Sequence, residues 1–292
     1  MLELMLPALV ASLILVGIHA YLGIHIIARG VIFVDLALAQ TAAMGWAAAN
    51  LGLADTLGGW LGVPEPAAGY AIGLAATLVA AGLFSVTRME HNYIPQEAII
   101  GIVYVVATAA TILLAAQAPR GSEHVEQLLT GSLLWVSWPQ IWRTAGIYAV
   151  IGAVHWFLRE RFMTITLNPA EARRRGWRIA GWDFLFYALF GLVVTLSVVI
   201  AGVLVVFSFL VIPAVIAFLF SSQPSRLIGI AWFAGTLATV VGLYGSYQTD
   251  WPTGPTVVVA FAVALMLAFV LRGLLRKYGS ETVVETGVAS NE

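Results

Sequence analysis

Long apolar stretches without a charged residue alternate with short polar segments along the chain. A charge in hydrocarbon is costly, so Lys, Arg, Asp and Glu are expected at the ends of membrane spans. The charge-free intervals cover residues 4–28, 36–54, 66–87, 98–119, 127–142, 144–158, 184–225, 227–249 and 251–271. This pattern predicts an all-α integral membrane protein, a polytopic bundle of transmembrane helices.

Two of these intervals do not have the length of one span. Residues 184–225 would extend about 63 Å as a single helix, roughly twice the hydrocarbon thickness. We expect two spans there, hinged near Ala201 and Gly202. The interval 127–142 is too short for a full crossing and contains Trp135, Trp138 and Pro139. Both features favour a re-entrant or interfacial half-helix. The prediction is nine spans and one half-helix, or eight spans if 184–225 is not divided.

Composition supports a membrane class and removes others. Apolar residues make up 61% of the 292 residues and charged residues only 10%, which excludes a soluble globule. A net charge of -1 gives no basic excess for nucleic acid. The chain has no cysteine, so a metal ion would meet nitrogen or oxygen ligands.

Basic residues indicate the orientation. If the Arg-rich loop 159–181 is cytoplasmic, twelve basic residues lie inside and only Arg120 and Arg143 lie outside. The positive-inside rule then predicts an N-terminus outside and a C-terminus inside the cytoplasmic membrane of a prokaryote. We expect one domain over residues 1–277, followed by a disordered cytosolic tail over 278–292.

Several enzyme motifs are missing. The single lysine, Lys277, precedes Tyr278, so the chain has no phosphate-binding loop of the GxxxxGK[ST] type. HExxH and GxSxG are also absent. We expect that the chain is not an enzyme, and that any ATP hydrolysis takes place in a separate partner subunit.

The loop between the predicted spans contains signals for a short helix. Asn168 suits the N-cap, Pro169 the first helical position, Glu171 the acid of a capping box, and Gly176 the end. Such a helix is too short to be stable alone, which favours docking on a cytosolic protein. Alternatively, its arginines only contact anionic lipid headgroups. The candidate docking residues are Pro169, Glu171, Ala172, Arg173, Arg174, Arg175 and Gly176.

Six segments in this order resemble the membrane permeases of ABC importers for zinc, manganese or iron. They are YLGIHIIARGVIFVDLALAQTAAMG (21–45), EAIIGIVYVVATAATILL (97–114), LLTGSLLWVSW (128–138), NPAEARRRG (168–176), AGVLVVFSFLVIPAVIAFLF (201–220) and DWPTGP (250–255). The resemblance covers nearly all of residues 5–272. It implies a homodimer of permeases, two cytosolic ATPase subunits that grip a coupling helix at 168–176, and an extracytoplasmic metal-binding protein. It also implies a transported divalent metal ion and no permanently bound cofactor.

The second predicted span departs from that family. A pattern like GDALSHAxLPG is usual there, with Asp and His one helical turn apart, whereas this chain has Leu36, Gln40 and Met44 at the usual Asp, His and Pro. Asp35 lies one residue early, rotated by about 100° on a helix. Either the helix turns, or the ligands differ, or the cargo is another molecule, such as a metal chelate.

Four polar residues of the first two spans are candidates for the translocation path: His19, His25, Asp35 and Gln40. Imidazole suits transition metals, and polar groups inside a membrane are expensive. The two histidines are about 240° apart on one regular helix, so they do not bind one ion together. Each candidate has a structural alternative: hydrogen bonding between helices, or, for Asp35, a structural ion pair.

Other polar residues have simpler explanations. Glu97 suits the start of a helix, and Glu123, His124 and Glu126 form a ligand-rich outer loop that is either a metal hand-over point or only solvated. The leading hypothesis is an ABC importer permease that works by alternating access. The alternative is a secondary transporter driven by an ion gradient, which would need several intramembrane carboxylates.

Overall fold

The computed structural model describes residues 2–88, 94–117, 131 and 133–288, and these ranges contain helices but no strand. The elements are α1 (Leu2–Arg29), α2 (Val34–Ala48), η1 (Ala49–Leu53), α3 (Ala54–Leu61), α4 (Glu65–Thr87), α5 (Gln96–Ala115), η2 (Leu133–Trp135), α7 (Trp138–Phe157), α8 (Arg159–Leu167), α9 (Pro169–Arg174), α10 (Ile179–Ala201), α11 (Val203–Phe220), α12 (Pro224–Thr249) and α13 (Thr253–Val288).

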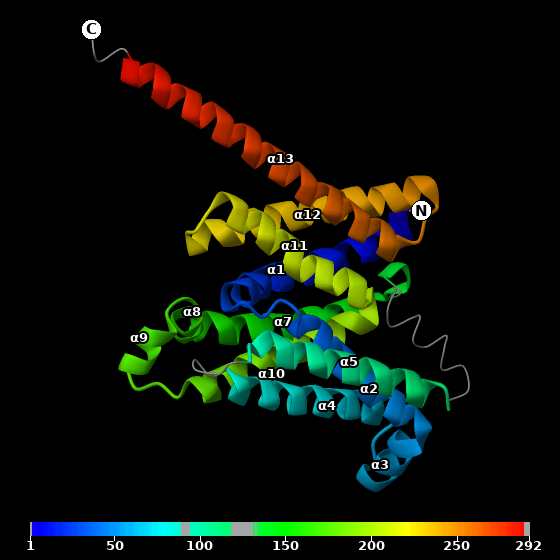
Figure 1. The fold of residues 1–292 in the computed structure, drawn as a ribbon. Coiled ribbons are helices and arrows are strands. Elements are labelled where there is room, and N and C mark those ends of the chain that lie inside the picture. Colours follow the sequence, from blue (N-terminus) through cyan, green and yellow to red (C-terminus); the bar gives the residue numbers. More distant parts are fainter. Residues whose placement is uncertain (1, 89–93, 118–130, 132, 289–292) are drawn as a thin grey trace.

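The helices pack as two adjoining groups (Figure 1). One contains α1, α11, α12 and α13, and the other contains α2, α4, α5 and α10; α7 contacts α1 and α10. Fully buried aromatic side chains, among them Phe186, Phe190 and Phe209, belong to one apolar core that spans both groups. Glycines bring backbones together: a Cβ at Gly23 of α1 would lie 1.9 Å from the carbonyl oxygen of Leu210 in α11.

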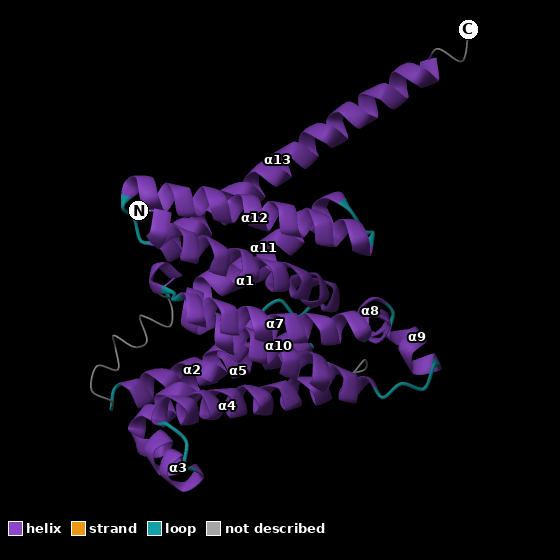
Figure 2. Cartoon of the chain, turned by 180° about the vertical axis from the view of Figure 1, so that it is seen from behind, coloured by secondary structure: helices purple, strands orange, loops and turns teal. Residues whose placement is uncertain are grey.

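The bundle has two distinct ends, with α8 and α9 at one and α3 at the other (Figure 2). Arg29 and Arg88, at the C-terminal ends of α1 and α4, both donate hydrogen bonds to α8. Arginines that are distant in the sequence thus gather at the α9 end.

The described residues contain at most eight candidate spans, where the charge-free intervals predict eight or nine. Seven described helices are long and apolar enough to cross a membrane, and α7 with α8, bent by 71°, would make an eighth. The second predicted span, 36–54, is divided because α2 has 15 residues and the chain kinks at Leu51 and Gly52. Fifteen residues rise about 22 Å, which is short of a bilayer core.

The predicted hinge in 184–225 is confirmed. α10 ends at Ala201 and α11 begins at Val203. Between them Gly202 has φ 79° and ψ 159°, a conformation that residues with a side chain rarely adopt.

Other predicted boundaries differ from the structure. α7 runs through Arg143, where the sequence predicts a border between a half-helix and a span. The Arg143 side chain is exposed near the start of α7, so its charge does not end the helix. Within 127–142, residues 127–130 and 132 lie outside the described residues. α13 continues as a helix to Val288, past Lys277, where regular structure was expected to end.

Candidate functional site

α9 is the short helix that the sequence predicts, and Asn168, Pro169 and Gly176 take the positions expected at its ends. The Asn168 side chain accepts a hydrogen bond from the backbone N–H of Glu171 at 3.1 Å, and Pro169 is the first helical residue. Gly176, at φ 71°, donates to the Arg173 carbonyl at 2.8 Å. The positive φ explains why glycine is required at this position.

The Glu171 side chain does not complete a capping box. Its carboxylate accepts hydrogen bonds from Arg175 at 2.8 Å and from Arg174 at 2.6 and 2.9 Å. Hydrogen bonds from Arg175 and then Arg174 hold the pKa of Glu171 below its usual value, so the carboxylate stays ionised at neutral pH. The capping-box role is wrong because the Asn168 N–H, which a box would use, donates to the Thr164 carbonyl at 2.8 Å.

α9 is supported by its own chain. Ala172 is fully buried, and α9 contacts both α8 and α10. The guanidinium of Arg161 lies 4.2 Å from the ring centre of Trp177, which follows Gly176. These contacts within the chain support the helix, and docking on an ATPase stays a prediction.

The four candidate path residues are all buried but are not brought together. His19 is 0%, His25 1%, Asp35 1% and Gln40 6% exposed. The Nδ1 of His19 lies 2.7 Å from the Leu15 carbonyl oxygen of its own helix. The Nε2 of His19 and the Oδ1 of Asp35 are buried without a hydrogen-bond partner in the described part of the chain. No group of three or more metal-binding side chains occurs among the described residues.

His25 contacts residues of α7 and α8 that the sequence did not associate with it. Its Nδ1 lies 2.9 Å from the Oγ1 of Thr166 in α8, and its ring centre is 6.5 Å from that of His155 in α7. The Nε2 atoms of both histidines are buried without a hydrogen-bond partner among the described residues. The Tyr21 hydroxyl lies 3.4 Å from His155 Nδ1. His155 was not a sequence candidate, because only the fold brings α7 beside α1.

His155 and Tyr21 line a cavity of about 670 Å³ between α1, α7, α8 and α12. The other walls are mainly apolar and include Ile14, Ile18, Tyr148, Met163 and Trp232. The cavity reaches Arg159 and Ser225 near the α9 end.

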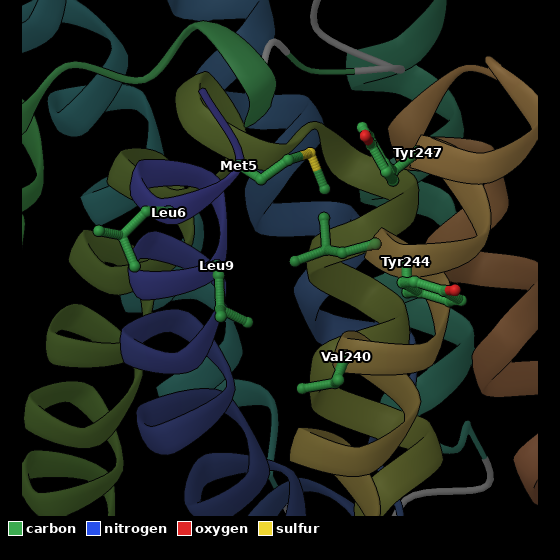
Figure 3. Close-up of a pocket in the computed structure, with 7 residues that line it drawn as sticks. Met5, Leu6, Leu9, Val240, Tyr244 and Tyr247 are labelled. Carbon is green, nitrogen blue, oxygen red and sulfur yellow. The ribbon is translucent and has the colours of Figure 1, made fainter. Parts of the chain in front are cut away.

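A second hollow has a different character. A groove of about 330 Å³ lies between α1 and α12 and is lined by Met5, Leu6, Leu9, Val240, Leu243, Tyr244 and Tyr247. Figure 3 shows side chains of the two helices facing each other across it. Its lining offers no carboxylate or imidazole, so a divalent cation would find no suitable ligand there.

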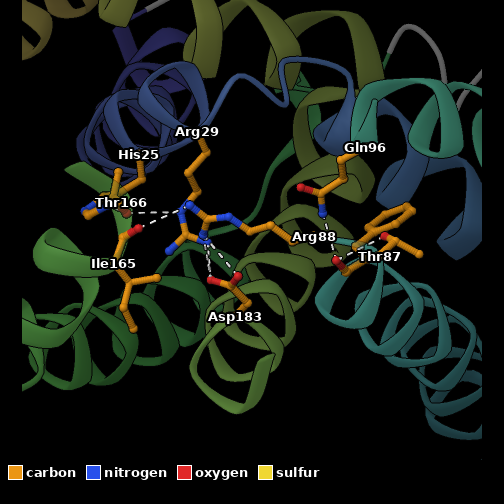
Figure 4. A network of polar contacts seen from close by, with 9 residues as sticks. His25, Arg29, Thr87, Arg88, Gln96, Ile165, Thr166 and Asp183 are labelled. Carbon is orange, nitrogen blue, oxygen red and sulfur yellow. Dashed lines mark hydrogen bonds and ion pairs between the residues drawn. The ribbon is translucent and has the colours of Figure 1, made fainter. Parts of the chain in front are cut away.

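A buried ionic network lies beside the base of α9 (Figure 4). Asp183, at 0% exposure, accepts hydrogen bonds from Arg29 Nη1 at 2.7 Å and from Arg88 Nη1 at 3.0 and 3.1 Å. The Arg29 Nε donates to Thr166 Oγ1 at 3.0 Å, and the Arg88 Nη2 donates to the Ile165 carbonyl at 3.2 Å. In the sequence, these charges indicate only span boundaries, because their pairing depends on three separate helices, α1, α4 and α10.

Of the remaining polar candidates, only Glu97 lies within the described residues. Glu97 accepts a hydrogen bond from the Phe33 backbone N–H at 2.9 Å, so it stabilises a helix N-terminus as predicted, although that of α2 and not of its own helix. Glu123, His124 and Glu126 lie outside the described residues.

Comparison with known proteins agrees with the sequence motifs. The manganese transport system membrane protein MntC of Listeria innocua is 27% identical over 218 residues, which cover 73% of this chain and 77% of the relative. The chelated iron transport system membrane protein YfeD of Yersinia pestis is 25% identical over 211 residues, 72% of this chain and 69% of the relative.

A solved structure shares the fold. PsaBC from Streptococcus pneumoniae in complex with Fab superposes with a TM-score of 0.72 at 21% identity, over 90% of each chain. The family model described as the ABC 3 transport family matches residues 1–272. Since this match covers nearly the whole chain, the protein belongs to the ABC 3 transport family, as its motifs predict.

Proposed function

We propose that this chain is the permease subunit of an ABC importer that moves a divalent transition-metal ion inward by alternating access. The observation that carries this proposal is the preformed α9, which the fold holds at the arginine-rich end of a membrane bundle of the ABC 3 transport family. ATP hydrolysis belongs to cytosolic ATPase subunits that grip α9. A second copy of the chain and an extracytoplasmic metal-binding protein complete the importer.

The distribution of charge supports one orientation. Arg29, Arg88 and the arginines of α9 lie at the same end of the bundle, which the positive-inside rule places in the cytoplasm. In this orientation the N-terminus is outside the membrane and the C-terminus inside.

The path of the ion follows isolated ligands in this proposal. Asp35, Gln40, His19 and His25 are buried in α1 and α2, and no group of three or more metal-binding side chains occurs among the described residues. One or two ligands at a time bind an ion weakly enough for it to leave, which conduction requires. The relatives are named for manganese and chelated iron, and zinc remains a third candidate.

A metal chelate is the second candidate cargo. Neither usual ligand of the second span is in register, since Leu36 and Gln40 stand at those positions. The cavity of about 670 Å³ is much larger than a bare ion needs and is mainly apolar, which suits an organic ligand around the metal. Uptake measured with free ion and with chelate separates the two.

A gradient-driven transporter has less support. The fully buried carboxylates of the described residues are those of Asp35 and Asp183. Asp183 is neutralised by two arginines, which leaves Asp35 as a single titratable acid for coupling to an ion gradient.

Charge reversal in α9 tests the docking part of the proposal. Replacing Arg173, Arg174 and Arg175 together with glutamate reverses the charge of the docking face, and we expect at least about tenfold weaker binding of the ATPase subunit. Co-purification from membranes measures it. The control is the double variant Arg272→Glu and Arg276→Glu on α13, whose side chains are also exposed. Normal assembly of the triple variant would remove the docking claim.

A further inference from the structure

The base of α9 is bonded to the membrane helices through two consecutive residues of α8. The Thr166 hydroxyl lies 2.9 Å from His25 Nδ1 and accepts from Arg29 Nε at 3.0 Å. The carbonyl of Ile165 accepts from Arg88 Nη2 at 3.2 Å. Both arginines also donate to Asp183. Figure 4 shows these groups converging from α1, α4, α8 and α10.

Little chain separates this network from α9. Thr166 is two residues before Asn168, the N-cap of α9, and the Asn168 N–H is itself bonded to the Thr164 carbonyl at 2.8 Å. A displacement of α9 consequently moves Thr166 as well, because no flexible segment lies between them.

The network resists being pulled apart. The side chains of Arg29 and Asp183 are 1% and 0% exposed, and that of Arg88 is 19% exposed. Hydrogen bonds weaken steeply beyond their usual range, and a buried charge that loses its partner is strongly unfavourable. Moving Thr166 and Ile165 is therefore easier if Arg29, Arg88 and Asp183, and the helices that bear them, move as well.

We propose that Thr166 is the joint through which a displacement of α9 reaches α1 and, through Arg29, the Asp183 network that links α1 to α4 and α10. Thr166 is a positioning residue and does not contact cargo. Through His25 it also adjoins the His155 wall of the cavity, so the same displacement alters the cavity. This inference rests on the proposed function, because it presumes that ATPase subunits move α9.

The test uses the complete complex of permease, ATPase and binding protein in vesicles. Thr166→Val keeps the shape of the side chain and removes its hydroxyl. We expect ATP hydrolysis to continue while the amount of ATP consumed per ion accumulated rises about tenfold, as expected for the loss of a buried hydrogen bond to charged groups. Thr166→Ser, which keeps the hydroxyl, is expected to restore the wild-type ratio.

Two further variants make the result decisive. Thr164→Val removes a hydroxyl from the same helix outside the network and is expected to leave the ratio unchanged. Arg29→Lys keeps a cation beside Asp183 but removes the Nε–H that donates to Thr166. It should therefore raise the ratio as Thr166→Val does. If Thr166→Val does not assemble, the result of Arg29→Lys alone tests the proposal. An unchanged ratio of ATP consumed per ion in Thr166→Val and Arg29→Lys would contradict the proposal that Thr166 is the joint. Absence of ATP-driven uptake by the wild type would instead overturn the proposed function.

Discussion

Asp183→Asn is expected to destabilise the protein by about 3–5 kcal/mol, because the substitution leaves two guanidiniums facing each other in a buried site. Asp183 is fully buried and accepts from both Arg29 and Arg88. A neutral amide keeps the size of the side chain but offers one acceptor oxygen and no charge. Thermal unfolding of the purified permease in detergent measures the loss.

The matched control is another acid-to-amide change in an ion pair. Glu160 pairs with Arg175 at 3.0 Å, but its side chain is 75% exposed. Exposed pairs contribute only about 0–1 kcal/mol, so Glu160→Gln should leave the unfolding temperature nearly unchanged. Equal stability of the two variants would contradict the buried network.

Gly23→Ala is the second substitution with a large expected effect. A Cβ at this position would lie 1.9 Å from the Leu210 carbonyl oxygen and 2.9 Å from the Leu210 carbonyl carbon. Both are backbone atoms, so α1 and α11 must separate, and overpacking of this kind costs about 1–3 kcal/mol or more. We expect a lower unfolding temperature and a reduced yield of folded protein.

Gly17→Ala is the control on the same helix. A Cβ at Gly17 meets no atom within 4 Å, and alanine has the higher helix propensity. Gly17→Ala should match or exceed the wild type in stability. A similar loss for both variants would show that the close contact of α1 with α11 is not the cause.

Features set by local sequence could be predicted. Asn168, Pro169 and Gly176 each act within one helical turn, so the ends of α9 follow from residue type alone. The hinge at Gly202 follows because 184–225 is too long for one span and contains a residue that accepts positive φ. The membrane class follows from the charge-free intervals in the same way.

Features set by contacts between distant segments could not be predicted from the sequence. Asp183 and its two arginines lie 95 and 154 positions apart, and no spacing rule joins them. His155 meets His25 only because α7 packs beside α1. The early end of α2 depends on the kink at Leu51 and Gly52, which an apolar interval does not reveal.

ATP-driven uptake by the complete complex in sealed vesicles tests the central claim most directly. Permease, ATPase and binding protein are reconstituted, and accumulation of manganese, iron and zinc, each as free ion and as chelate, is followed with ATP and with a non-hydrolysable analogue. If the chain is an importer permease, we expect one of these cargoes to accumulate, and only when ATP is hydrolysed. Accumulation of none by an assembled complex that hydrolyses ATP, or accumulation driven by an ion gradient without ATP, would contradict it.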